Sequence, residues 1–171
     1  MTFAEQAQLG ESFVGLGADA AHINTALGRT GGPVELAWIT SLATPRMGFA
    51  PFVTVLAPNL PVKPYTLFVN KAAIANETHG LLTWGAAQAG VAAGVADAVA
   101  DHIIPVEEVD NLRIIVAVWV NPEASDEQAV FVNNRTATCR ALQAGADLSP
   151  DINAILTARA KPQNPFFSGV Q

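Results

Sequence analysis

The chain has little charge and almost no cysteine. Of its 171 residues, 9 are Lys or Arg and 15 are Asp or Glu, so 14% are charged, against about 25% in an average soluble domain. The net charge of -6, with Lys and Arg scattered singly, argues against a nucleic-acid partner, because phosphates require a basic patch. Cys139 stands alone, which excludes an intrachain disulfide and fits a reducing cytoplasm. So little charge also suggests that much surface is hidden, in a membrane or in an oligomer.

A long hydrophobic run is missing too. The uncharged stretch 81–96 contains Thr83 and Gln88 and is shorter than the roughly 20 apolar residues that a membrane helix needs. Its glycines, Gly90 and Gly94, therefore indicate close packing of a helix in a soluble protein. The first residues lack the basic and apolar regions of a secretory signal. These observations predict one cytoplasmic domain over residues 1–171, with oligomer formation rather than a membrane hiding the apolar surface.

Hydrophobic periodicity divides the chain into alternating strands and helices. Strands are expected over residues 12–16, 20–27, 50–57, 66–74 and 112–120, and helices over 33–42, 78–101 and 125–144. Ser125 and Gln128 form a capping-box pattern at the start of the last helix. Such interleaving predicts an α/β two-layer sandwich with a mixed sheet. Residues 149–151 begin either a short helix or a final strand. The tail from Lys161 is expected to be extended and to pack through Phe166 and Phe167.

A proline-rich connector, residues 57–65, joins two apolar strands. Its three prolines fix φ and remove backbone donors, so the loop has little freedom to lose on folding. A stiff loop between buried strands can hold functional groups in fixed places. Lys71 follows the second strand where a hydrophobe is expected. It either snorkels to water from the strand end or belongs to a site, and the pattern favours neither.

Alternation along residues 20–27 places His22 and Asn24 on one face and Ile23 and Leu27 on the other, toward the core. His22 alone reads as a surface histidine, whereas with Asn24 beside it the pair can give or take a proton. Gln88 falls on an apolar helical stripe with Leu81, Trp84 and Val91. A buried amide there needs a partner or costs roughly 1–3 kcal/mol, and either a structural group or a ligand can supply it.

The remaining candidates are weaker. His79 and His102 lie near the ends of the long predicted helix, where capping or solvent exposure is expected. The spacing of His, Cys, Asp and Glu suggests no metal site. The glycine loop 28–32 before a helix resembles an anion-binding turn but lacks the lysine of a phosphate-binding loop.

Taken together, these pieces resemble the formaldehyde-activating enzyme family. The resemblance rests above all on Ala-His-Ile at 21–23, on the proline loop Ala-Pro-Asn-Leu-Pro-Val-Lys-Pro at 57–64 and on Asn-Lys at 70–71. It extends to residues 10–15, 28–35, 85–88, 95–99, 104–105 and 165–166, and so covers nearly the whole chain. What it implies is a fold like the second domain of ribosomal protein S5, assembled as a homopentamer with sites between subunits.

The resemblance also implies an activity. The family condenses formaldehyde with tetrahydromethanopterin to give the 5,10-methylene derivative and water, without a metal. His22 matches the family's proposed general acid, and Lys71 and Gln88 match positions that contact the pterin. Val53 stands where a contacting Leu is usual.

Some positions depart from the family pattern. Asn24 replaces an Asp, Ala73 replaces a Thr, and Asn121-Pro122 replaces a His-Trp pair. Asn24 can orient His22 but cannot supply the carboxylate charge that favours an imidazolium. Two alternatives to the working enzyme therefore stand: a non-catalytic pterin or one-carbon binder or sensor, and a relative acting on another aldehyde or pterin.

Overall fold

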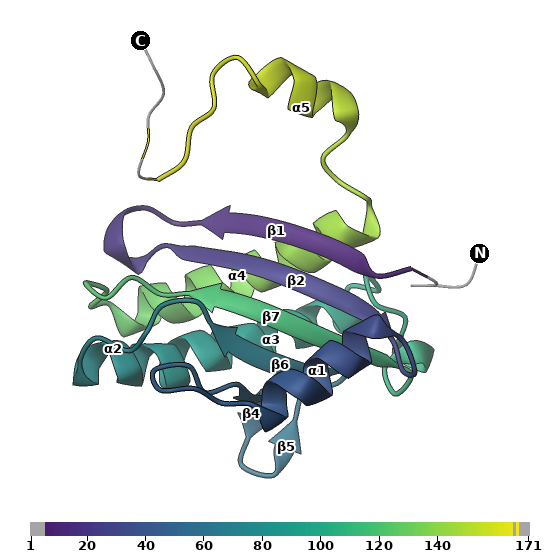
Figure 1. The fold of residues 1–171 in the computed structure, drawn as a ribbon, viewed down its shortest axis with the longest axis horizontal. Coiled ribbons are helices and arrows are strands. Elements are labelled where there is room, and N and C mark those ends of the chain that lie inside the picture. The colour runs from purple at the N-terminus through teal and green to yellow at the C-terminus, as the bar shows by residue number, and fades with distance from the viewer. Residues whose placement is uncertain (1–5, 166, 168–171) are drawn as a thin grey trace.

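A computed structural model describes residues 6–165 and 167 of the chain. Its main sheet has five strands in the order β1-β2-β7-β6-β3 (Figure 1). They are β1 (Gln8–Val14), β2 (Ala21–Arg29), β7 (Leu112–Trp119), β6 (Tyr65–Asn70) and β3 (Phe52–Val53). Three neighbouring pairs are antiparallel, whereas β6 runs parallel to β7. The predicted mixed sheet is confirmed.

Helices cover both faces of this sheet unequally. The long helices α3 (Gln88–Ala100) and α4 (Glu127–Ala146) lie behind it, and α1 (Pro33–Ala43) crosses part of the front (Figure 1). On β7 every second residue, from Leu112 to Val118, has no solvent exposure, so the core fills the space between the sheet and the rear helices. A Cβ at Gly28 would lie 2.7 Å from Cγ2 of Val34, which shows how closely α1 approaches one end of the front face. The other end is left open.

The predicted long helix is present but not regular. It consists of α2 (Glu77–Leu81), a π-helical segment (Leu82–Ala87) and α3. The wider π-helical turn shifts the phase of the side chains, so Leu81 and Trp84 are 68% and 45% exposed instead of sharing the buried stripe of Gln88. The interpretation of the small residues is confirmed: a Cβ at Gly90 or Gly94 would overlap backbone atoms of α4.

Two local predictions need correction. The N-cap of α4 is Asp126, whose side chain accepts from the amide of Ala129. Ser125 lies one residue before this cap, and the amides of both Ser125 and Asp126 donate to Oδ1 of Asp19. The strand predicted over 50–57 is interrupted, since β4 (Val55–Ala57) leaves the main sheet and pairs with β5 (Leu60–Pro61). The proline connector is thus a small hairpin, with Asn59 at φ 66° in its turn.

The C-terminal segment leaves the body of the protein. After α4, a short helix α5 (Ile152–Ala158) is capped by Asp151, which decides the alternative left open by the sequence. The helix stands beyond the β1 edge (Figure 1), and every residue of it is exposed. The tail is not simply extended, because Asn164 and Phe167 exchange two backbone hydrogen bonds and close a turn. Phe167 is 46% exposed; Phe166 lies outside the described residues.

Candidate functional site

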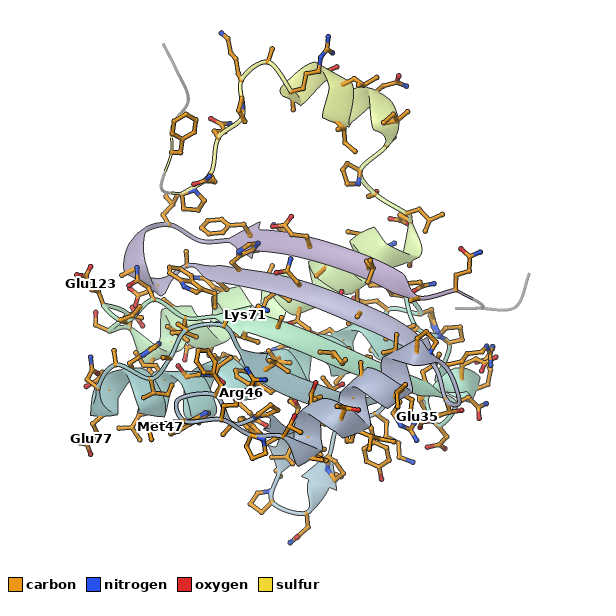
Figure 2. The ribbon with its side chains drawn as sticks, viewed as in Figure 1. Glu35, Arg46, Met47, Lys71, Glu77 and Glu123 are labelled. Carbon is orange, nitrogen blue, oxygen red and sulfur yellow. The ribbon has the colours of Figure 1, made fainter. Side chains whose placement is uncertain are left out.

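The open end of the front face carries a row of side chains from neighbouring strands. In the strand register Phe13 of β1 is opposite His22 of β2, which is opposite Trp119 of β7. Lys71 follows β6 directly, and its amide donates to the carbonyl of Val118 at 2.7 Å, which sets it beside Trp119. Figure 2 shows Lys71 over this open face. Strand alternation and register therefore bring an imidazole and an ammonium group to the same side of the sheet.

A cavity of about 440 Å³ lies over this row. Its lining consists of two aromatic rings, three polar or charged side chains of the sheet and two residues of the C-terminal tail: Phe13, Trp119, His22, Asn24, Lys71, Asn164 and Pro165. A neighbouring hollow of about 850 Å³ shares Phe13, His22, Trp119 and the tail residues with it. Three of the residues predicted to form the site, His22, Asn24 and Lys71, thus share one cavity.

The geometry around His22 gives it a partner. Its Nε2 lies 2.9 Å from Oε1 of Glu11, which projects from β1 on the same face. The Phe13 ring also lies near the imidazole, with 6.1 Å between ring centroids and a tilt of 55°. The His22 side chain remains 42% exposed, so a ligand can reach it. An imidazole held in this way can present a proton to a bound molecule.

The other predicted residues lie away from this cavity. Gln88 begins α3 behind the sheet, is 8% exposed, and accepts the amide hydrogen of Val55 at 2.6 Å. Val53 of β3 pairs with Leu67, on the far edge of the sheet from β1. Ala73 is exposed in the loop after Lys71 and faces Gly48. A single chain therefore brings together only half of the predicted set.

Comparison with known proteins identifies the family of the chain. The sequence pattern of the formaldehyde-activating enzyme family matches residues 9–167. The chain belongs to the formaldehyde-activating enzyme family. It is 39% identical over 161 residues to a protein of Methanosarcina barkeri named 5,6,7,8-tetrahydromethanopterin hydro-lyase, covering 94% of this chain and 90% of that one.

Longer relatives also match. The bifunctional enzyme Fae/Hps of Methanosarcina acetivorans is 36% identical over 149 residues, which are 87% of this chain and 38% of that protein. The same enzyme from Methanosphaera stadtmanae is 34% identical, over 94% of this chain and 39% of its own length. This chain thus corresponds to little more than a third of the bifunctional relatives.

Several residues of this formaldehyde-activating enzyme family member were missed from the sequence. Phe13 and Trp119 sit on strands that were recognised, whereas β1 begins at Gln8 and includes Glu11, which precedes the strand expected over 12–16. Only the strand register shows that these residues flank His22. The alternation of Glu11 and Phe13 along β1 was the available signal. Asn164 and Pro165 reach the cavity from the far end of the chain, and no local pattern points there.

The structure excludes one of the two alternatives expected for His79, which were capping and solvent exposure, because the side chain is 1% exposed. Its Nδ1 accepts from the amide of Ala75 at 3.1 Å, and its Nε2 lies 3.0 Å from the carbonyl oxygen of Val120. The ring therefore ties the loop after Lys71 to the strand end after Trp119. His79 supports the site from behind without lining it.

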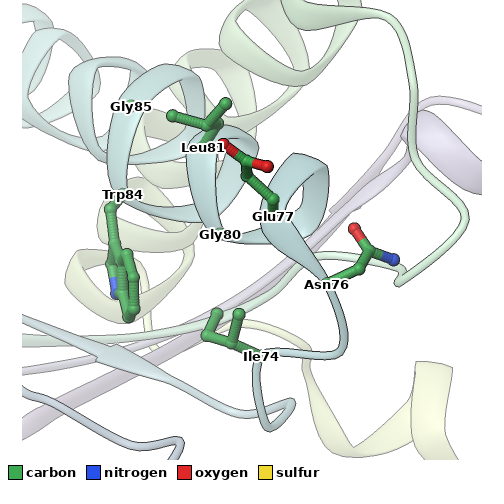
Figure 3. A pocket seen from close by; sticks show the side chains of 7 residues that line it. All are labelled: Ile74, Asn76, Glu77, Gly80, Leu81, Trp84 and Gly85. Carbon is green, nitrogen blue, oxygen red and sulfur yellow. The ribbon is translucent and has the colours of Figure 1, made fainter.

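A second hollow, of about 550 Å³, lies beside α2. Figure 3 shows Ile74, Leu81 and Trp84 around it. The surface is almost entirely apolar, with Asn76 and Glu77 at its margin. The residues predicted to form the site do not line this hollow.

Metal and thiol chemistry find no support among the described residues. Within 6–165 and 167, no group of three or more His, Cys, Asp or Glu side chains is arranged to hold a metal ion. Burial raises the pKa of the Cys139 thiol, so the thiolate needed for nucleophilic attack is disfavoured. No helix in this part of the chain is long and apolar enough to cross a bilayer.

Proposed function

We propose that this protein condenses formaldehyde with tetrahydromethanopterin to give 5,10-methylenetetrahydromethanopterin and water. The observation that carries the proposal is the cavity shared by His22, Asn24 and Lys71 in a chain that belongs to this family. The relative from Methanosarcina barkeri, which has a nearly matching length, bears the name of this activity. His22 is the general acid, and Asn24 and Lys71 are substrate contacts.

The chemistry needs little more than a positioned proton. A pterin nitrogen adds to formaldehyde to give a hydroxymethyl amine. His22 gives one proton to its hydroxyl group, which leaves as water and produces an iminium ion. The second pterin nitrogen attacks that carbon and then loses its own proton, which closes the five-membered ring. A positioned general acid accelerates such a step about 10²–10⁴-fold, and holding both nitrogens oriented adds an entropic advantage.

The cavity suits a reduced pterin. Phe13 and Trp119 offer aromatic surfaces to a flat heterocycle, and Asn24 offers both a donor and an acceptor to its polar edge. The Lys71 ammonium can bond an oxygen of the ligand. A cavity lined by aromatic side chains with a few convergent polar groups is typical of small-molecule sites.

The remaining members of the predicted set require a neighbouring subunit. Gln88, Val53 and Ala73 lie outside the His22 cavity of their own protomer, so we propose that they meet the pterin across an interface in a homopentamer. Exposed apolar side chains support self-association: Leu81 and Trp84 beside the apolar hollow, and Ile152, Ile155 and Leu156 on α5. We further propose one domain over residues 1–171, a fold of the ribosomal protein S5 domain 2 type and a cytoplasmic location.

Stopped-flow condensation kinetics test this function. Formaldehyde is mixed with tetrahydromethanopterin alone, with the protein, and with His22→Ala. We expect the protein to exceed the spontaneous rate and His22→Ala to lose about 10²-fold or more of that acceleration. His102→Asn is the matched control, because His102 is exposed at φ 59°, where asparagine is well tolerated, and it should match the parent protein.

The outcomes separate the alternatives. Pterin binding without acceleration would favour a non-catalytic carrier or sensor. Acceleration that survives His22→Ala in full would refute the assignment of the general acid while keeping the reaction.

A further inference from the structure

The carboxylate nearest to His22 comes from the neighbouring strand and not from its own. Position 24, two residues along β2 on the same face, holds a neutral amide. Glu11 lies directly opposite Asn24 in the β1–β2 register, and its Oε1 reaches back to Nε2 of His22 at 2.9 Å. No part of the sequence pattern had singled out Glu11.

Glu11 supplies a negative charge that the described residues lining the His22 cavity do not. The Lys71 ammonium lines the same cavity as His22. Glu11 is in hydrogen-bond contact with the imidazole and places a negative charge beside it. The described residues that line this cavity include no carboxylate, so Glu11, on the wall of the adjoining hollow, supplies the only acidic contact that the structure gives to His22.

The contact also fixes the orientation of the ring. Glu11 engages Nε2, so in the proposed reaction Nδ1 is the ring nitrogen that gives the proton. The same division of labour operates in catalytic triads, where a carboxylate holds one imidazole nitrogen and the other nitrogen exchanges the proton.

We propose that Glu11 is the positioning residue of His22, holding the imidazole in its proton-donating orientation and providing the negative charge that Asn24 lacks. This inference rests on the proposed function for its kinetic consequence, but the contact itself exists in the free protein. Glu11 and Asn24 are cross-strand partners on one face, so a carboxylate at either position can serve the same ring.

The test is a series of variants that remove the carboxylate at position 11 and then place one at position 24, measured by stopped-flow kinetics. Glu11→Gln keeps the size of the side chain and removes its charge. We expect it to lower kcat about 10-fold, the value of one charge-assisted hydrogen bond, with less than about a 2-fold change in KM for the pterin. Adding Asn24→Asp to Glu11→Gln should restore most of the loss. Glu107→Gln, an exposed carboxylate on the 3-10 turn before β7, is the control and should be unchanged.

Each result decides the matter. An unchanged kcat in Glu11→Gln, or a loss confined to KM, would overturn the proposal. A double variant no faster than Glu11→Gln would overturn the claim that a carboxylate at either position can serve His22. All variants are checked by thermal unfolding, which a substitution at a side chain 59% exposed should hardly affect.

A second readout does not depend on catalysis. Nitrogen-15 NMR of the free protein reports which imidazole nitrogen of His22 carries the proton. We expect Glu11→Gln to change the ring-nitrogen shifts of His22, and identical spectra would overturn the proposal. Should the parent protein fail to accelerate the condensation, the proposed function falls, and this spectrum still decides the role of Glu11.

Discussion

Gln88 has two competing roles, a contact with the pterin and a structural hydrogen bond, and a single substitution can distinguish them. Family resemblance makes it a pterin contact, whereas the structure gives its Oε1 to the amide of Val55 at 2.6 Å in a site where the side chain is 8% exposed. Gln88→Met retains the length and volume of the side chain and removes the acceptor. If the structural role dominates, the substitution should act on the stability of the fold.

The magnitude follows from the lost partner. Leaving the part-buried Val55 amide without an acceptor costs about 1–3 kcal/mol of the free energy of unfolding. For a chain of this size each 1 kcal/mol shifts Tm by roughly 2–4 °C, so a Tm lower by about 2–12 °C is expected. Gln143→Met is the matched control: Gln143 is exposed and bonds only Asp147 one turn away, so its loss should stay within about 0.5 kcal/mol.

Thermal and urea unfolding are measured beside the steady-state constants of the condensation. An unchanged Tm together with a raised KM for the pterin would refute this reasoning and establish Gln88 as a ligand contact. A lower Tm with an unchanged KM would leave it a structural residue. Both effects together would mean that the buried amide serves the ligand through its second polar group.

Two further predictions concern helix packing and pH. Gly94→Ala should lower the free energy of unfolding by about 1–3 kcal/mol, because its Cβ would overlap backbone atoms of Arg135. Gly85→Ala, where nothing lies within 4 Å, should be neutral or slightly stabilising in the same unfolding assay. The Arg135 guanidinium lowers the pKa of Asp97, so their pair stabilises the fold above the usual pKa of about 3.9 and is lost as pH falls through the lowered value. Asp97→Asn should reduce the loss of unfolding free energy at acidic pH by about 1 kcal/mol or less. A loss as large as that of the parent protein would contradict the assignment.

Most of what the sequence could predict about the site followed from the alternation of side chains along strands. Ile23 and Leu27 are buried, while His22 and Asn24 face outward, because a side-chain period of two leaves no other arrangement once one face is apolar. The failures have a different origin. Ser125 and Asp126 are both good N-cap residues, so local preference does not decide between them, and in the structure Asp126 is the cap. The shift of phase within the π-helical segment depends on packing that no local propensity describes.

Long-range register is the other limit. Glu11 meets His22 only because β1 pairs with β2 in one particular alignment, and a shift by one residue would send Glu11 to the opposite face. Asn164 reaches the cavity after α5 has carried the chain away from the body and the tail has turned back (Figure 1). Neither contact has a sequence spacing that could be searched for.

The placement of Gln88 and His22 also bears on assembly. His22 lies on the open front face at the β2 position next to the β1 edge, whereas Gln88 begins a helix behind the sheet and bonds β4 beyond the opposite edge. The sheet itself separates the two side chains, so a single pterin cannot touch both within one protomer. A ligand contact at Gln88 therefore requires a second protomer whose rear surface meets the front face of the first. Kinetic evidence for Gln88 as a pterin contact would accordingly be evidence for a site shared between subunits, and a purely structural Gln88 would leave His22, Asn24 and Lys71 as a site that one chain completes.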